Sequence, residues 1–320
     1  MIANSLGSVF TSAVAPPLAI AALGYLLGRW KDIDIEPLST VTIYLLLPAL
    51  IFHSLATIPL SGVTALGLVV VMCGFTAIMA LTTAIVGSLF KESGTILSGA
   101  MLAAAFPNVG NFGIPVATFA FGDIGRTTAV VFSIVQNVLM YTLGVYVLSR
   151  NGDGNRARVA AVKRVFALPM TYAVIAAGGA LAFDLVPPPD GPTMQAVEMM
   201  GNASIPLFLI ILGLQIADMA PKSTVRRVLP TVTLKLLIAP VVAVSVGLAT
   251  GLVDTTAGQA FIVLAAGPAA VTPLVLTIEF TDSTGDGLSP VDYVGTVILL
   301  TIAGCLPIVT SLILLFASFP

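Results

Sequence analysis

Charged side chains are scarce in this chain of 320 residues, in which Asp, Glu, Lys and Arg make up only 9%. An average soluble domain carries about 25%. Apolar residues make up 58%, and the mean hydropathy is +1.07. A water-soluble globule of this composition would expose far more apolar surface than stable monomers do. The composition therefore excludes an ordinary soluble domain and predicts an all-α polytopic membrane protein, with the lipid bilayer as its surroundings.

Further absences exclude other classes of function. The net charge of -2 and the lack of any Lys or Arg run argue against nucleic acid as a partner. Cys73 and Cys305 stand alone inside apolar segments, without the spacing of a metal or redox pair. With one histidine and no pair of membrane aspartates, the chain lacks the residues of an intramembrane protease or a metal hydrolase. We therefore expect no metal, no cofactor and no enzymatic activity.

Apolar stretches long enough to cross a bilayer, at roughly 20 residues each, recur along the whole chain. The ten stretches are residues 5–28, 37–57, 63–90, 94–121, 126–149, 165–183, 193–216, 226–251, 256–280 and 290–318. A polar loop at 150–164 divides them into two blocks of five, 1–149 and 165–320. Because five is odd, the blocks enter the membrane in opposite orientations, as in the inverted repeats of many secondary transporters. Pro48 and Pro206 occupy corresponding places in the two blocks.

Lys and Arg are concentrated in the odd-numbered connections between these stretches, whereas the even-numbered connections hold only Arg126. Positively charged loops remain in the cytoplasm. The loop at 150–164 is therefore expected to be cytoplasmic. With ten crossings, both termini are then extracytoplasmic, and we expect the protein to be a multi-pass component of the cell (plasma) membrane.

One apolar stretch contains residues that disrupt helices. Residues 93–122 include no ionisable side chain, yet the sequence FPNVGNFGIP occupies 106–115 in their middle. Thirty residues are too few for two crossings and ample for one, so the disruption must lie near the middle of a single crossing. Residues 255–278 give the same result, with Pro268 and Pro273 central. Broken backbone in hydrocarbon is tolerated only when it is buried in protein or lines a cavity.

The composition of the two breaks favours an anion site over a pair of merely kinked packing helices, which is the alternative. Prolines remove backbone donors, and glycines allow unusual dihedrals and close backbone approach. The residues expected to form the breaks are Pro107, Gly110, Gly113, Pro115, Pro268 and Pro273. Asn108, Asn111 and Thr272 can replace the lost hydrogen bonds. If the broken helices cross, two half-helix N-termini face one point with partial positive charge, which suits a carboxylate.

These motifs resemble those of the auxin efflux carrier family, which includes plant auxin exporters and bacterial carriers of malonate or malate. PNVGNFGIP resembles the family's broken fourth helix, LLPALIFHSLA its second, QNVLMY its fifth, LKLLIAPVV its eighth and GPAAVTPLVL its ninth. The matches run from residue 37 to about 280 in the family's order. The long cytoplasmic loop of the long-looped plant exporters is absent, which argues against auxin itself as the substrate.

The resemblance implies ten transmembrane helices in two inverted five-helix repeats, with helices four and nine broken and crossing. It also implies a scaffold and a transport domain, an elevator movement and a homodimer. The implied function is that of a carrier, used as an exporter, of a small organic anion or weak carboxylic acid. In the family, the position matched by Asn108 faces the substrate carboxylate. The expected substrate-binding residues are Asn108, Asn111, Asn137, Gln136, Ile51, Leu50, His53, Val271 and Thr272.

The driving force and two polar residues within the predicted crossings leave alternatives open. No Asp or Glu lies in 93–122 or 255–278, which counts against coupling through a central intramembrane carboxylate and favours export driven by the membrane potential. A sodium- or proton-coupled transporter of the same fold is one alternative, and a ligand-gated receptor or channel is another. His53 either contacts substrate or protons, or bonds a neighbouring helix. Lys235 is an intramembrane charge and therefore a candidate functional residue. The favoured interpretation is structural, in which it bonds the C-terminal carbonyls of a half-helix or snorkels.

Overall fold

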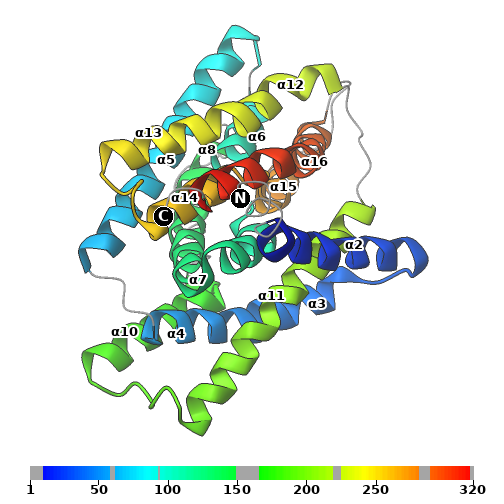
Figure 1. The fold of residues 1–320 in the computed structure, drawn as a ribbon. Helices are drawn as coiled ribbons and strands as arrows, with labels where there is room; N and C mark the ends of the chain where they lie inside the picture. The colour runs from blue at the N-terminus through cyan, green and yellow to red at the C-terminus, as the bar shows by residue number, and fades with distance from the viewer. Residues whose placement is uncertain are drawn as a thin grey trace.

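The structure, a computed structural model, describes residues 10–57, 62–92, 94–148, 166–218, 225–280 and 289–317. These residues form helices and contain no β-strand (Figure 1). The α-helices are α2 (Ala15–Trp30), α3 (Ile35–Val41), α4 (Leu47–Thr57), α5 (Gly62–Leu89), α6 (Gly94–Ala105), α7 (Ile114–Leu139), α8 (Val145–Leu148), α10 (Pro169–Ala182), α11 (Pro192–Asp218), α12 (Val225–Thr233), α13 (Ala239–Ala249), α14 (Thr256–Ala265), α15 (Thr272–Phe280) and α16 (Pro290–Ala317). The predicted all-α class is confirmed. The predicted loop at 150–164 lies outside the described residues.

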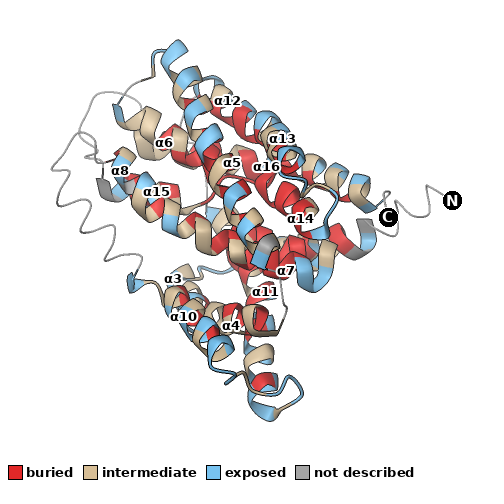
Figure 2. Ribbon diagram, turned by 90° about the vertical axis from the view of Figure 1, so that its left-hand side faces the viewer, coloured by how far each residue is buried: buried red, intermediate tan, exposed pale blue. Residues whose placement is uncertain are grey.

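Helix length and surface composition confirm that the protein crosses a membrane several times. Six helical stretches are long and apolar enough to span it: Ile35–Thr57, Thr64–Leu89, Val109–Leu148, Pro192–Asp218, Val225–Ala249 and Pro290–Ala317. Large apolar side chains such as Leu66, Leu81 and Tyr172 are exposed. Figure 2 shows exposed residues along the outer faces of many of the helices. Such faces would be unfavourable in water and are stable against lipid tails. Ten crossings in two inverted repeats remain a prediction.

Several helices widen into a π-helical turn just before a proline. The turns η1 (Phe10–Val14), η2 (Thr42–Leu46), η3 (Val109–Gly113) and η6 (Leu234–Ile238) each end two residues before Pro16, Pro48, Pro115 and Pro240, respectively. A proline ring clashes with the carbonyl group four residues earlier and offers no N–H to it. A wider turn moves that carbonyl aside without ending the helix. One further π-helical turn, η4 (Met140–Gly144), has no proline at this place.

The helices pack in two groups. In the first, which we call the α4 group, α2, α3, α4, α10 and α11 contact mainly one another. The remaining helices, α5 to α8 and α12 to α16, form the α7 group. Figure 2 shows α3, α4 and α10 gathered at one side of the α7 group. Within the α4 group, α2 and α11 pack so closely that a Cβ on Gly213 would overlap the carbonyl oxygen of Ala21.

Two helices of the α7 group stop inside the protein. α6 ends at Ala105 and α14 ends at Ala265, and the extended segments that follow them pass each other in antiparallel directions. The N–H of Asn108 donates to the carbonyl of Pro268 at 2.7 Å, and the N–H of Ala270 donates to the carbonyl of Phe106 at 2.9 Å. Backbone groups that would otherwise be stranded in an apolar interior are therefore paired at the crossing.

The predicted connection between the fourth and fifth crossings is replaced by a break of one residue. α7 (Ile114–Leu139) consists of two helical segments that meet at a kink at Gly122, where φ is 61° and ψ is -142°. Glycine adopts this positive φ without the strain that a side chain would add. Arg126 was expected in this connection. It lies four residues after this kink, at the start of the second segment of α7, and is only 5% exposed.

Candidate functional site

A cavity of about 250 Å³ lies where the two helix breaks cross, between the α4 group and the α7 group. The α7 group contributes residues from η3, the first residue and last turns of α7, η4 and the start of α15. The α4 group contributes residues from α3, η2, the start of α4, α10 and α11. Its polar lining residues are Ser39, Thr42, Asn108, Asn111, Ser133, Gln136, Asn137, Tyr141, Gln215 and Thr272. Among the described residues, no charged side chain lines it. The cavity therefore presents neutral hydrogen-bonding groups on an otherwise apolar wall.

The side-chain amide of Asn108 has one hydrogen-bonded atom, Oδ1, and one atom without a partner among the described residues, Nδ2. It is the N-cap of η3, where its Oδ1 accepts a hydrogen bond from the backbone N–H of Asn111 at 3.2 Å. Its backbone carbonyl accepts from Gly113 at 2.9 Å. Its Nδ2 is buried and has no partner among the described residues. A buried unpaired donor costs about 1–3 kcal/mol, so a molecule with an acceptor at this place would stabilise the protein.

The other amides around the cavity differ in how far they are occupied. Asn111 Nδ2 donates to Gln215 Oε1 at 3.3 Å, a hydrogen bond that joins η3 to α11 across the two groups. Asn137 Nδ2 donates to the carbonyl of Ser133 one turn earlier, at 2.7 Å. Gln136 Oε1 is buried without a partner among the described residues. Asn108 and Gln136 thus keep unused hydrogen-bonding capacity, whereas Asn111 and Asn137 are partly occupied.

Two helix N-termini reach the cavity beside these amides. η3, which leads directly into α7, begins at Val109, and α15 begins at Thr272, and both residues line the cavity. The first turns of helices carry unpaired N–H groups and about half a positive charge. These N-termini contribute partial positive charge to the cavity without a cationic side chain, and helix N-termini can bind anions.

The two glycines of the first break behave differently from the prediction. Neither Gly110 nor Gly113 has a positive φ, so the expected unusual dihedrals are wrong. Close approach holds only at Gly113, where an added Cβ would lie 2.7 Å from Leu264 Cδ2 and 3.4 Å from the carbonyl oxygen of Asn108. Nothing lies within 4 Å of such an atom at Gly110, which faces the open cavity.

The structure brings most of the predicted binding residues together. Around the cavity lie Asn108, Asn111, Gln136, Asn137, Val271 and Thr272. Leu50 and Ile51 are not among the lining residues, because they point into the core around α4 and are 1% and 0% exposed. His53 also lies elsewhere, with its Nε2 4.0 Å from Glu198 Oε2 of α11.

Gln215 and Ser133 line the cavity although sequence reasoning did not select them. Gln215 was recognisable as a lone amide in the apolar stretch LFLIILGLQIA. No comparable signal separates Ser133 from the other hydroxyl residues of the apolar segments.

Lys235 has the structural role that the sequence predicts. It is fully buried, and its Nζ donates to the carbonyl of Ala265 at 3.2 Å. Ala265 is the last residue of α14, where the helix dipole places partial negative charge. The same Nζ lies 5.8 Å from the centroid of the Phe75 ring, which adds a cation–π contact. This lysine therefore stabilises the end of the second broken helix.

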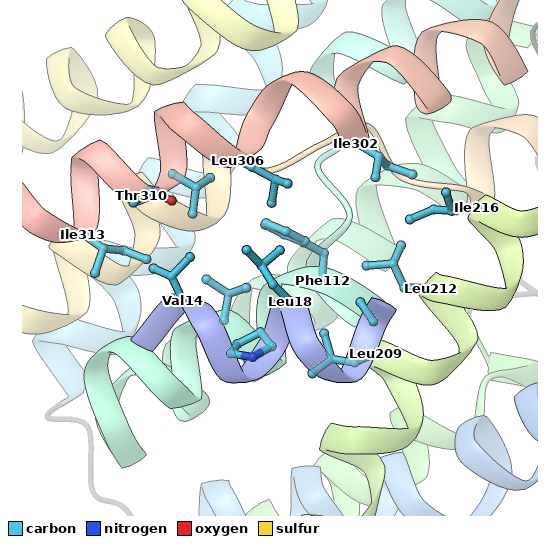
Figure 3. A pocket seen from close by; sticks show the side chains of 14 residues that line it. Val14, Leu18, Phe112, Leu209, Leu212, Ile216, Ile302, Leu306, Thr310 and Ile313 are labelled. Atoms are coloured by element: carbon cyan, nitrogen blue, oxygen red, sulfur yellow. The ribbon is translucent and has the colours of Figure 1, made fainter. Parts of the chain in front are cut away.

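A second, apolar cavity of about 80 Å³ lies on the other side of η3 (Figure 3). Figure 3 shows Phe112 between α2 and α16, with Leu18 and Leu306 close to it. Thr310 is the one hydroxyl residue among its lining side chains. This space offers almost no hydrogen-bonding partner, so it does not suit a charged molecule.

Similarity to known membrane transport proteins extends along nearly the whole chain. The sequence matches the family described as "Membrane transport protein" over residues 9–313. A protein of Methanothermobacter thermautotrophicus named "Uncharacterized transporter" is 30% identical over 241 residues, which cover 74% of this chain and 78% of that protein. A protein of Rhizobium meliloti (strain 1021) named "Putative malonate transporter" is 27% identical over 284 residues, which cover 84% of this chain and 86% of that protein.

Proposed function

Because this chain belongs to the membrane transport protein family, we propose that it is a carrier that exports a small organic anion, a weak carboxylic acid. The observation that carries this proposal is the buried, unpaired Nδ2 of Asn108, a residue that lines the cavity together with the first residues of η3 and α15. An amide donor binds a carboxylate without the penalty of burying a second charge. The helix termini add a positive potential at the same place.

Cavity size and similarity together indicate the substrate class. Sites for drug-sized ligands enclose about 300–1,000 Å³, and this cavity encloses about 250 Å³. Its several amides and hydroxyls can hydrogen-bond both ends of a short acid. One relative carries malonate in its name. A mono- or dicarboxylate of a few carbons is therefore the first class to test.

The two helix groups support an elevator mechanism. The α4 group contains the first two predicted crossings of each five-helix block, and the α7 group contains the other three of each. This division is expected of two inverted repeats that contribute equally to a scaffold and to a moving transport domain. Asn108, Gln136 and Thr272 all belong to the α7 group. The α7 group would carry the substrate past the α4 group, through which two copies would form a homodimer.

Among the described lining residues there is no charged side chain, and this determines how much charge moves through the membrane potential during transport. When the α7 group moves with the anion bound, the charge that the substrate site carries across the membrane is the charge of the anion. With the predicted orientation in the plasma membrane, both termini are extracytoplasmic. Each elementary negative charge that leaves an inside-negative cell gains about 2.3 kcal/mol per 100 mV. Export in this account needs no coupled sodium ion or proton.

The test is flux of radiolabelled malonate from vesicles reconstituted with the purified protein under an imposed potassium-diffusion potential. Malonate efflux should accelerate when the vesicle interior is made negative, should saturate with malonate concentration, and should be unaffected by sodium. Vesicles without protein and vesicles with Asn108→Ala protein serve as controls. If malonate efflux required a sodium or proton gradient, transport would be coupled to that ion and the potential-driven mechanism would be wrong. Large unitary currents would instead identify a channel, and the carrier proposal would be wrong.

A further inference from the structure

Arg126 is a buried cation outside the cavity, and it keeps one hydrogen-bonding position unused. Its Nη1 donates to Asn202 Oδ1 of α11 at 3.0 Å, and its Nη2 lies 3.0 Å from Asp123 Oδ1. Its Nε is buried and has no partner among the described residues. Buried arginines normally pair all of their donors, because an unpaired charged donor in the interior is unfavourable. The free Nε leaves one donor of this guanidinium available to a further acceptor.

The surroundings of Arg126 form a polar cluster between the two helix groups. We call Arg126, Asp123, Asn202, His53 and Glu198 the Arg126 cluster. His53 of α4 lies 4.0 Å from Glu198, and the charges of Arg126, Glu198 and Asp123 are close enough to act on it. The Asp123 side chain is 71% exposed and that of Glu198 is 46% exposed, so the cluster extends from the interior to the surface. None of its members lines the cavity.

The Arg126 cluster lies in line with the cavity. Ser133 follows Arg126 by seven residues on α7, which is two helical turns on the same face and about 10 Å at 1.5 Å per residue. On α11, Phe208 follows Asn202 by six residues, about 9 Å. Ser133 and Phe208 both line the cavity. The Arg126–Asn202 hydrogen bond therefore joins the two groups about 10 Å along α7 from the lining residue Ser133, toward the side predicted to be extracytoplasmic.

We propose that the Nε and Nη2 donors of Arg126 form a second carboxylate-binding site, which receives the anion as it leaves the cavity outward. Its place on the path rests on the proposed function. A guanidinium binds a carboxylate best through two parallel hydrogen bonds along one edge. Asp123 uses only one donor of this edge, as an exposed neighbour three residues away, and such surface pairs are weak. A substrate carboxylate can replace it and use both donors.

The two acidic residues of the Arg126 cluster, Asp123 and Glu198, place negative charge beside this second site. Asp123 competes directly for Nη2, and Glu198 adds a further negative charge nearby. Both lower the affinity for an anion, which suits a position of release. Asn202 orients the guanidinium while the groups are together, and movement of α7 along α11 must break that hydrogen bond and expose the Nε.

Malonate affinity at each membrane face separates this role from a purely structural one. Half-saturating malonate concentrations are measured from the outer and the inner face in vesicles of defined orientation. Arg126→Lys keeps the charge but loses the two-donor edge, so the outer value should rise at least about 10-fold, the worth of one hydrogen bond to a charged group. The inner value should stay within about twofold of wild type. Asn108→Ala should raise both values, and Arg226→Lys, at an exposed arginine far along the chain, should change neither. Equal changes at both faces in Arg126→Lys would refute the site.

Malonate binding can be measured without transport, so this second test does not depend on whether the protein moves malonate. The rise in thermal unfolding temperature with malonate is followed in detergent. Asp123→Asn removes the competing carboxylate and should strengthen malonate binding, and adding Arg126→Lys should abolish that gain. If the wild type binds malonate without moving it, the proposed function fails while this comparison still decides the site. If neither the wild type nor Asp123→Asn binds malonate, both proposals are wrong.

Discussion

Replacement of Asn108 tests the anion site at its best-defined contact. The structure separates two functions of this side chain. Its Oδ1 caps η3 by accepting from Asn111, and its Nδ2 remains free for a ligand. Asn108→Ala removes both functions, whereas Asn108→Ser retains an oxygen that can cap the helix and lacks the amide donor. The pair of variants therefore distinguishes loss of the cap from loss of the substrate contact.

The expected magnitudes follow from these two interactions. A hydrogen bond to a charged carboxylate contributes about 1.5–3 kcal/mol, so both variants should weaken malonate binding roughly 10- to 150-fold, at about 1.4 kcal/mol per decade. Loss of the cap costs about 1 kcal/mol of stability, and it should appear only in Asn108→Ala. Asn108→Asp keeps the capping oxygen but places a negative charge beside the anion, so its binding should be weaker still. Asn137→Ala should lose less affinity, because the Asn137 Nδ2 is already bonded to Ser133.

Isothermal titration of the purified variants with malonate gives the affinities, and thermal unfolding without ligand gives the stabilities. Variants are compared only when they elute as folded protein of the same size as the wild type. Wild-type affinity in both Asn108→Ser and Asn108→Ala would show that the amide does not contact the substrate. The helix break would then be a structural feature alone.

The remaining predictions concern the crossing, the packing of the α4 group and the orientation. Thr301→Val should destabilise the protein by about 1–3 kcal/mol in thermal unfolding, because the buried N–H of Ala269 loses its acceptor at 3.1 Å; an unchanged unfolding temperature would contradict this. Gly213→Ala should destabilise by about 1–3 kcal/mol or more through overlap with the backbone of α2. Gly74→Ala, where the nearest atom would be 3.9 Å away, should not, and equal effects in the two would contradict the packing. A cysteine at Asn155, in a background without the native cysteines, should resist membrane-impermeant thiol reagents added outside intact cells. Labelling there would reverse the predicted topology.

The helix breaks were predictable from sequence because they combine two signals that seldom coincide. A window such as 93–122 has room for only one crossing, and it contains prolines and glycines that a continuous helix excludes. Asn108 and Asn111 were therefore identifiable as the polar groups at the break. The pairing of the two breaks through Pro107 and Ala269 was not, because it depends on contacts between segments far apart in the chain.

Arg126 shows where sequence reasoning fails. A charge between two apolar stretches normally marks a loop, and the positive-inside rule treats it so. Here Gly122 turns the chain without a loop, and Asn202 of a distant helix pairs with the guanidinium. Burial of a charge depends on partners from elsewhere in the chain, which hydropathy along the sequence does not reveal.

Leu50 and Ile51 illustrate the reverse case, since a correct helix assignment did not determine which face of α4 is turned toward the cavity.

A single-particle structure of the protein in lipid nanodiscs with saturating malonate would show directly whether the anion binds at the helix crossing. We expect density for a small anion in the cavity at the helix crossing, within hydrogen-bonding distance of Asn108 Nδ2 and beside the N-termini of η3 and α15. A parallel sample of Asn108→Ala protein should lack that density at the same malonate concentration. Malonate density confined to another part of the protein, with an empty crossing in wild type, would contradict the account.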